Sequence, residues 1–225
     1  MTMNFGQKCY MIKKFKGVEN MIKNIIFDLG NVIINYDQQH IINSFTDKEE
    51  EIEYIYDEIF HSKEWTMMDL GDITNDEAIN IINERNNFKY NKLTQDFLHE
   101  WYKKQNINRD IVELAKRLKE KGYNLYVLSN MANLTYEYFK KDEFFSLCTG
   151  IIISAHEHIK KPDERIYKLL LDKNNLKPEE CVFIDDDETG RNYESANKIG
   201  IKGRKVIPNQ VEDIKKMLIE NNVDI

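Results

Sequence analysis

The chain has 225 residues, a formal net charge of -7, 41% hydrophobic residues and 32% charged residues, so a sizeable core can form beneath a well-solvated surface. The acidic balance argues against nucleic acid as a main partner, because phosphate backbones recruit basic patches. No apolar run approaches the roughly 20 residues that a membrane span needs, so we expect no membrane partner and a cytoplasmic protein.

Residues 1–20 contain four lysines but no continuous apolar stretch, and we expect an N-terminal tail rather than a signal peptide. The three cysteines, Cys9, Cys148 and Cys181, lie far apart and lack C-x-x-C spacing. An odd number without that spacing favours free thiols in a reducing compartment over a disulfide or a metal site.

Short apolar runs alternate with helical patterns over most of the chain. The predicted strands cover residues 22–27, 124–128, 150–153, 181–184 and, more weakly, 204–207. The predicted helices between and after them cover residues 111–121, closed by Gly122, then 164–172 and 209–221. Strands that alternate with helices predict an α/β, Rossmann-like fold, with a mainly parallel sheet and helices on both faces.

The segment 37–107 breaks this alternation, because helical patterns follow one another over residues 38–45, 48–60, 75–85 and 94–104. Thr74 and Glu77 have the spacing of a capping box. We therefore predict a helical cap at 37–107, inserted after the first strand into a core made of residues 21–36 and 108–225. Trp65, Met67 and Met68 lie between two predicted helices, where they either face a site or fill the cap's own core.

Polar residues follow the predicted strands. Asp28 ends the first strand, Ser129 and Asn130 end the second, Lys161 precedes a proline, and the acids 185–187 end a later strand. Each of these features alone also fits a turn, a helix cap or a solvated surface charge. Because the carboxyl ends of parallel strands share one edge of a sheet, the four are expected to meet there. Together they form a set suited to phosphoryl transfer.

These segments resemble the motifs of the haloacid dehalogenase-like hydrolase superfamily. IIFDLGNVI resembles the first motif, VLSN the second, KKPDERIY the third and VFIDDD the fourth, over about residues 22–207. The FDLGNV and KPDERIY versions look most like the subgroup of glucose-1-phosphate phosphatases and the N-terminal phosphatase domain of epoxide hydrolases. The insert matches the position of that family's cap, which closes over the site.

The resemblance implies a phosphatase that acts on a small phosphorylated metabolite, such as a sugar phosphate. It assigns Asp28 as the nucleophile, which forms an aspartyl-phosphate that water then hydrolyses. Ser129 and the backbone N–H of Asn130 would bind the transferred group, and Lys161 would stabilise its charge.

The resemblance also implies one Mg²⁺ ion as cofactor, held by Asp28, by the backbone carbonyl of Gly30 and by acids of the fourth motif. We favour Asp185 and Asp186 for the last role because they follow the strand directly. The family usually has an Asn about four residues after its two acids, whereas here the stretch up to Asn192 is longer by two residues. Asp187 then fits a helix N-cap.

Gly30 is the main departure, because most phosphatases of the family carry there a second Asp that acts as general acid and base. Such catalysis is typically worth about 10²–10⁴-fold. Without this acid, esters of good leaving groups, such as aryl and anomeric phosphates, are expected to react much faster than alkyl phosphates. A second departure is His158, where Gly is frequent; we expect an exposed loop histidine.

Two alternative functions follow from the same residues. A haloacid dehalogenase also uses an Asp nucleophile and lacks the second Asp, but it needs no metal and no acidic cluster such as 185–187. A non-catalytic binding protein on this fold would have Gly30 as its mark of lost activity. No pattern in the sequence indicates the oligomeric state.

Overall fold

A computed structural model of the chain describes residues 21–225; the predicted tail at 1–20 and Cys9 lie outside the described residues. Five parallel strands form the central sheet in the order β5-β4-β1-β6-β7, which confirms the predicted α/β fold. The strands are β1 (Asn24–Phe27), β4 (Asn124–Ser129), β5 (Gly150–Ile153), β6 (Cys181–Asp185) and β7 (Lys202–Lys205). The last lies two residues earlier than predicted, because this edge strand reads KGRK and has no apolar signal.

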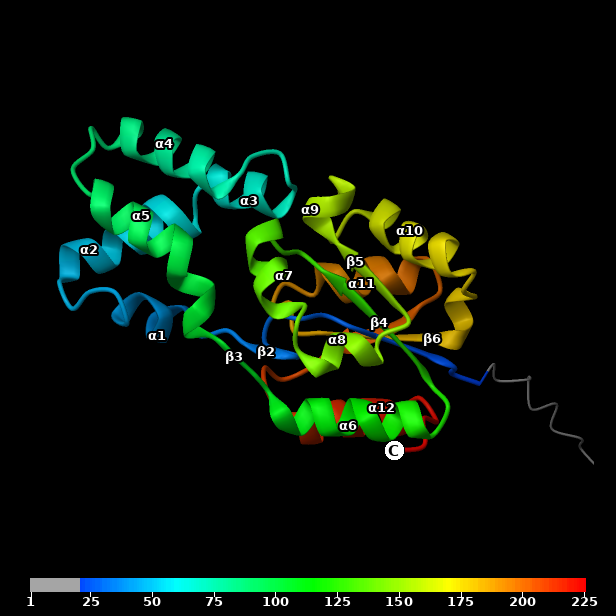
Figure 1. Cartoon of the computed structure of the whole chain (residues 1–225). Coiled ribbons are helices and arrows are strands. Elements are labelled where there is room, and N and C mark those ends of the chain that lie inside the picture. The colour runs from blue at the N-terminus through cyan, green and yellow to red at the C-terminus, as the bar shows by residue number, and fades with distance from the viewer. Residues whose placement is uncertain (1–20) are drawn as a thin grey trace, which may run out of the picture.

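Helices cover both faces of the sheet, as predicted (Figure 1). They are α6 (Arg109–Glu120), α7 (Asn133–Phe139), α8 (Glu143–Leu147), α9 (Ser154–Glu157), α10 (Glu164–Asn174), α11 (Arg191–Lys198) and α12 (Val211–Glu220), with a 3₁₀ turn at Pro178–Glu180. Ile25 and Phe27 pack into the cluster that holds apolar residues of α6 and α12, whereas Ile26 packs with those of α10. The sequence did not predict α7, α8, α9 or α11, which are short and carry few buried residues.

Two strands absent from the predictions, β2 (Ile34–Asn35) and β3 (Asn106–Ile107), pair antiparallel and flank a helical insert. The insert contains α1 (Gln38–Asn43), α2 (Glu49–Tyr54), a π-helical turn (Ile55–Phe60), α3 (Lys63–Asp69), α4 (Asn75–Arg85), α5 (Asn91–Glu100) and a 3₁₀ turn (Trp101–Lys104). These helices lie to one side of the sheet layers (Figure 1). We propose that residues 37–107 are the cap and that 21–36 with 108–225 are the core.

Local signals in the cap are partly confirmed. Thr74 and Glu77 form the predicted capping box at the start of α4. The placement of Trp65, Met67 and Met68 between helices was wrong, because all three lie on α3, whose seven residues are too few to show a helical period. Within residues 21–225, no helix combines the length and the apolar composition that crossing a membrane requires. Cys148 and Cys181 are free thiols.

The end of α3 is where the cap meets the core. Gly71 follows the helix with a φ of +69°, and a Cβ at this position would lie 2.1 Å from the carbonyl oxygen of Ala155 in α9. The Ser154 hydroxyl, which is fully buried, donates a hydrogen bond to the carbonyl of Asp69. This close approach fixes the last turn of α3 against the carboxyl end of β5.

We predict that Gly71→Ala destabilises the protein by more than about 2 kcal/mol, because a side chain adds a steric clash with backbone to the roughly 1–2 kcal/mol cost of a left-handed conformation. Gly122→Ala is the matched control, since Gly122 has a φ of +92° but open space around its Cβ position. Urea unfolding measures both losses. Equal losses would contradict tight docking of α3.

Candidate active site

The carboxyl ends of three neighbouring strands bring together the polar residues predicted from the sequence. Asp28 follows β1, Ser129 ends β4 on one side of it, and Asp185 ends β6 on the other. All three are buried. The register that pairs Phe27 with Ile184 sets Asp28 beside Asp185, because adjacent strands lie about 4.8 Å apart. The sheet topology alone therefore forces two carboxylates into one small space.

Lys161 lies between these two carboxylates. Its Nζ is 2.9 Å from Asp28 Oδ1 and 2.8 Å from Asp185 Oδ2, and its side chain is only 1% exposed. Burial lowers the pKa of Lys161, but the charges of Asp185 and Asp28 outweigh this effect, so that its pKa lies above the ordinary value. The ammonium group thus stays charged and links the third motif to the first and the fourth.

The charged form of Asp28 is still disfavoured, although Lys161 lies beside it. Burial raises the pKa of Asp28, the Lys161 ammonium opposes the rise, and the Asp185 carboxylate adds to it. A hydrogen bond from the Ser129 side chain favours the charged form. The Leu29 N–H also donates to Asp28 Oδ1 at 2.7 Å. One carboxylate oxygen is therefore fixed by donors, which orients the other.

Asp186 adds a third carboxylate. Oxygen atoms of Asp28, Asp185 and Asp186 all lie within 4.8 Å of one another. Burial and the charge of Asp28 raise the pKa of Asp186 to about 7. One ammonium group cannot neutralise three clustered acids, and clustered carboxylate oxygens are the ligands that Mg²⁺ prefers. The donor set therefore fits a hard divalent cation.

Asp187 is not the helix N-cap expected from the sequence, because Gly190 takes that position before α11. Its carboxylate accepts hydrogen bonds from the backbone N–H groups of Thr189 and Asn192, and its own N–H donates to Asp185 Oδ1. Asn192 Nδ2 lies 3.2 Å from both oxygens of Asp185. The two extra residues of this motif thus form a loop closed by Asp187, which returns Asn192 to the acid.

Asn130 has a contact that the sequence did not indicate. Its Nδ2 donates to the carbonyl of Lys161 at 2.9 Å, and its Oδ1 accepts from the Lys161 N–H at 2.8 Å. This reciprocal pair fixes the backbone that carries the buried ammonium group. The side chain of Asn130 therefore positions Lys161, while its backbone N–H is the group expected to bind the transferred phosphoryl group.

Gly30 borders a cavity of about 190 Å³ that opens beside the predicted site residues. A Cβ at position 30 would meet nothing within 4 Å, so the absence of a side chain there is not imposed by packing. The other walls of the cavity come from β2 and the residue after it, from the loop after β4 and the helix α7 that follows, and from the cap. They include Tyr36, Trp65, Asp69 and Asn130.

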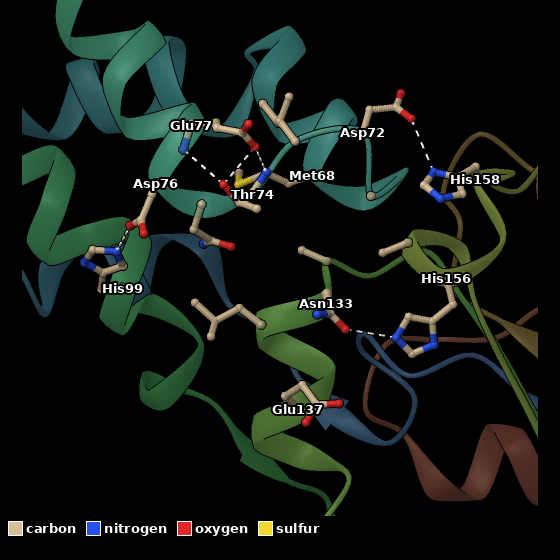
Figure 2. Close-up of a pocket in the computed structure, with 16 residues that line it drawn as sticks. Met68, Asp72, Thr74, Asp76, Glu77, His99, Asn133, Glu137, His156 and His158 are labelled. Carbon is tan, nitrogen blue, oxygen red and sulfur yellow. Dashed lines mark hydrogen bonds and ion pairs between the residues drawn. The ribbon is translucent and has the colours of Figure 1, made fainter.

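A larger cleft of about 580 Å³ separates the cap from the core (Figure 2). His158 on the core side pairs with Asp72 of the cap, with 3.5 Å between Nδ1 and Oδ1, and its side chain is 63% exposed. The predicted nucleophile and acidic cluster do not line this cleft. These residues do not line the smaller cavity either, but Gly30 and Asn130, two of the predicted site residues, border it, so it is the better candidate for substrate.

The family model of the haloacid dehalogenase-like hydrolases matches residues 22–200. The chain belongs to this family. The resemblance expected from its four motifs is thus confirmed, and so is its assignment as a hydrolase. A family enzyme from Bacteroides thetaiotaomicron, solved with magnesium and inorganic phosphate, is 25% identical with a TM-score of 0.69, over 84% of this chain and 96% of that one.

Curated relatives of this hydrolase agree with the predicted subgroup. Bifunctional epoxide hydrolase 2 of Rattus norvegicus is 32% identical over 104 residues, which are 43% of this chain and 18% of that protein. A sesquiterpene phosphatase of Aspergillus oryzae is 22% identical over 80% of this chain and 88% of its own length. The chain spans about a third or less of the first curated relatives that it matches. A solved dehalogenase, 20% identical with a TM-score of 0.62 over 82% of this chain and 84% of that one, shares the fold.

We predict that Lys161→Met destabilises the hydrolase by about 3–5 kcal/mol at neutral pH in chelator, because it leaves two buried carboxylates without a partner. The loss should shrink as the pH falls, since protonation removes the repulsion between Asp28 and Asp185. Lys160→Met is the control, because Lys160 is only half-buried and its ammonium donates a long hydrogen bond of 3.4 Å to Thr66 instead of joining two buried carboxylates. Urea unfolding at several pH values measures both; equal losses would contradict the role of the buried ion triad.

Proposed function

We propose that this hydrolase is a Mg²⁺-dependent phosphatase that cleaves a small phosphomonoester through an aspartyl-phosphate on Asp28. The observation that carries the proposal is the arrangement of Lys161 between Asp28 and Asp185, with Asp186 beside them. A carboxylate nucleophile, an ammonium group and an acidic cation site are the groups that phosphoryl transfer requires.

The residues have distinct roles in this proposal. Asp28 attacks phosphorus with the oxygen that Lys161 does not hold, and water later releases phosphate from the aspartyl-phosphate. Ser129 and the backbone N–H of Asn130 bind oxygens of the transferred group. Lys161 keeps Asp28 ionised and oriented, and it offsets the charge that builds between nucleophile and phosphoryl oxygens.

Asp28, Asp185, Asp186 and the backbone carbonyl of Gly30 would hold the Mg²⁺ ion. When bound, it supplies positive charge that neutralises phosphoryl oxygens. The same acids distinguish this proposal from a dehalogenase, because a carboxylate nucleophile that displaces halide gains nothing from two more acids beside it. A non-catalytic binding role has no need of a buried ammonium group held against a potential nucleophile.

The cavity beside Gly30 supports a small substrate. Its volume of about 190 Å³ is below the roughly 300–1,000 Å³ of pockets that take drug-sized ligands. Tyr36, Trp65 and Trp101 supply aromatic walls, and Gln105 and Thr135 supply polar groups. Buried Gln105 Nε2 has no hydrogen-bond partner within the described residues. Aromatic faces with a free donor suit a compact polyol such as a sugar.

We predict that Asp28→Asn lowers phosphatase turnover to background while the fold is kept, because the amide matches the carboxylate in shape but is no nucleophile. Initial rates on p-nitrophenyl phosphate with Mg²⁺ measure the loss, and circular dichroism checks the fold. Near wild-type turnover in this variant would remove Asp28 from the mechanism.

We predict that chelator abolishes turnover and that Mg²⁺ restores it. Mg²⁺ at about 100 times its Kd should also stabilise the folded protein by about 2.7 kcal/mol, because it binds only the folded acidic cluster. Asp186→Asn should lose most of this stabilisation, whereas Glu188→Gln, which removes an exposed neighbouring charge, should keep it. Thermal unfolding with and without Mg²⁺ measures the shift; full turnover in excess chelator would favour the dehalogenase alternative.

A further inference from the structure

Asp69 of the cap lines the same cavity as Gly30, the position at which the family's usual acid is absent. Asp69, Gly30 and Asn130 border one cavity, Gly30 lies two residues after the predicted nucleophile, and the charge of Asp28 acts on Asp69. Asp69 does not follow a strand directly, because it is the last residue of helix α3. The fold thus places the carboxyl group of Asp69 at the cavity beside Gly30, where the first motif supplies no acidic side chain.

The position of Asp69 is fixed by the core. Ser154 Oγ donates to the Asp69 carbonyl and accepts from the Met131 N–H at 2.9 Å, so one buried hydroxyl ties the end of α3 to the loop after β4. Gly71 makes backbone contact with Ala155 possible two residues further on. The carboxyl group is therefore carried by a helix end with two anchors, not by a free loop.

The surroundings of Asp69 favour a carboxyl group that exchanges protons near neutral pH. Burial raises its pKa to about 7, the Lys160 ammonium opposes the rise, and the charge of Asp28 adds to it. Tyr36, the other ionisable group of the cavity, has a pKa raised by burial and stays neutral. Efficient general acids have pKa values near the working pH.

We propose that Asp69, carried by the cap, donates the proton to the leaving oxygen in phosphoryl transfer at Asp28, in place of the side chain that Gly30 lacks. This inference rests on the proposed phosphatase function. In the first step, the Asp28 oxygen bonds to phosphorus, the bond from phosphorus to the ester oxygen breaks, and the proton of Asp69 passes to that oxygen to give an alcohol.

The second step reverses the proton transfer. Water attacks the aspartyl-phosphate, its proton passes to the Asp69 carboxylate, and the bond between Asp28 and phosphorus breaks to release phosphate. Asp69 regains its proton, so the cycle is balanced and needs no other reactant. Because this acid belongs to the cap, proton transfer becomes possible only when α3 is docked on the core.

The test compares kcat/KM for p-nitrophenyl phosphate, whose leaving group needs no proton, with kcat/KM for glycerol phosphate, whose leaving group needs one. We expect Asp69→Asn to lower the value for glycerol phosphate by about 10²–10⁴-fold and to change that for p-nitrophenyl phosphate little. Asp72→Asn is the matched control, because this cap acid borders the other cleft and should leave both values unchanged.

A rescue variant separates proton donation from a structural role. Space around position 30 is open, so Gly30→Asp in the Asp69→Asn background should restore part of the lost rate on glycerol phosphate. Asp69→Ser provides a second test of the same loss if the Asn variant unfolds. Equal slowing of both esters in either Asp69 variant, or no slowing of glycerol phosphate, would overturn the proton-donor role.

The two failures are distinguishable. If the wild-type protein hydrolyses both esters and the Asp69 variants keep its leaving-group preference, only the proton-donor role falls. If the wild-type protein hydrolyses neither ester with Mg²⁺, the proposed function falls and the inference with it. From the sequence alone, we expect kcat/KM of the wild-type enzyme to fall steeply from p-nitrophenyl phosphate to glycerol phosphate. Proton donation by Asp69 predicts only a small fall. The comparison of the two esters in the wild-type enzyme therefore decides between these two expectations.

Discussion

The buried contact of Lys161 with Asp28 and Asp185 is the constraint on which the rest of the site depends. Parallel strands β1 and β6 end side by side; Asp28 directly follows the first and Asp185 ends the second. Two such carboxylates in a dry space destabilise the fold unless a cation compensates them. Lys161 meets this need only in part once Asp186 is added, and the remaining negative charge is what makes the cluster a candidate site for a divalent cation. The stability of the fold and the proposed chemistry therefore depend on the same charged side chains.

The cap completes what the core lacks. In the proposed mechanism, the core supplies a nucleophile, donors and acids at or just beyond the carboxyl ends of its strands, but it has no side chain at Gly30. The end of α3 brings Asp69 and the aromatic wall of Trp65 to the same cavity. Ser154 ties this helix end to the core through a single buried hydroxyl. If Asp69 donates the proton as proposed, substrate selection and proton transfer depend on the docking of the cap, whereas binding of the phosphoryl group does not.

The strand-end residues could be predicted from the sequence because apolar runs such as CVFI report buried strands, and parallel strands place their carboxyl ends together. Asp69 could not be found in this way, since it reaches the site through a contact with Ser154, 85 residues away in the sequence. Helix α3 and strands β2 and β3 were also missed, because elements of two to seven residues show no hydrophobic period. For Asn192 a signal existed, the Asn of the fourth motif, but only the folded loop shows that Asp187 restores its reach to Asp185.

In the proposed mechanism, Asp28 carries the phosphoryl group during turnover. Acid quenching during hydrolysis of p-nitrophenyl phosphate with Mg²⁺, followed by peptide mass spectrometry, tests it directly. We expect one phosphoryl group on the peptide that contains Asp28, labile to hydroxylamine as acyl phosphates are, and absent in Asp28→Asn. Sustained hydrolysis with no modification of Asp28, or with the phosphoryl group on another residue, would contradict it.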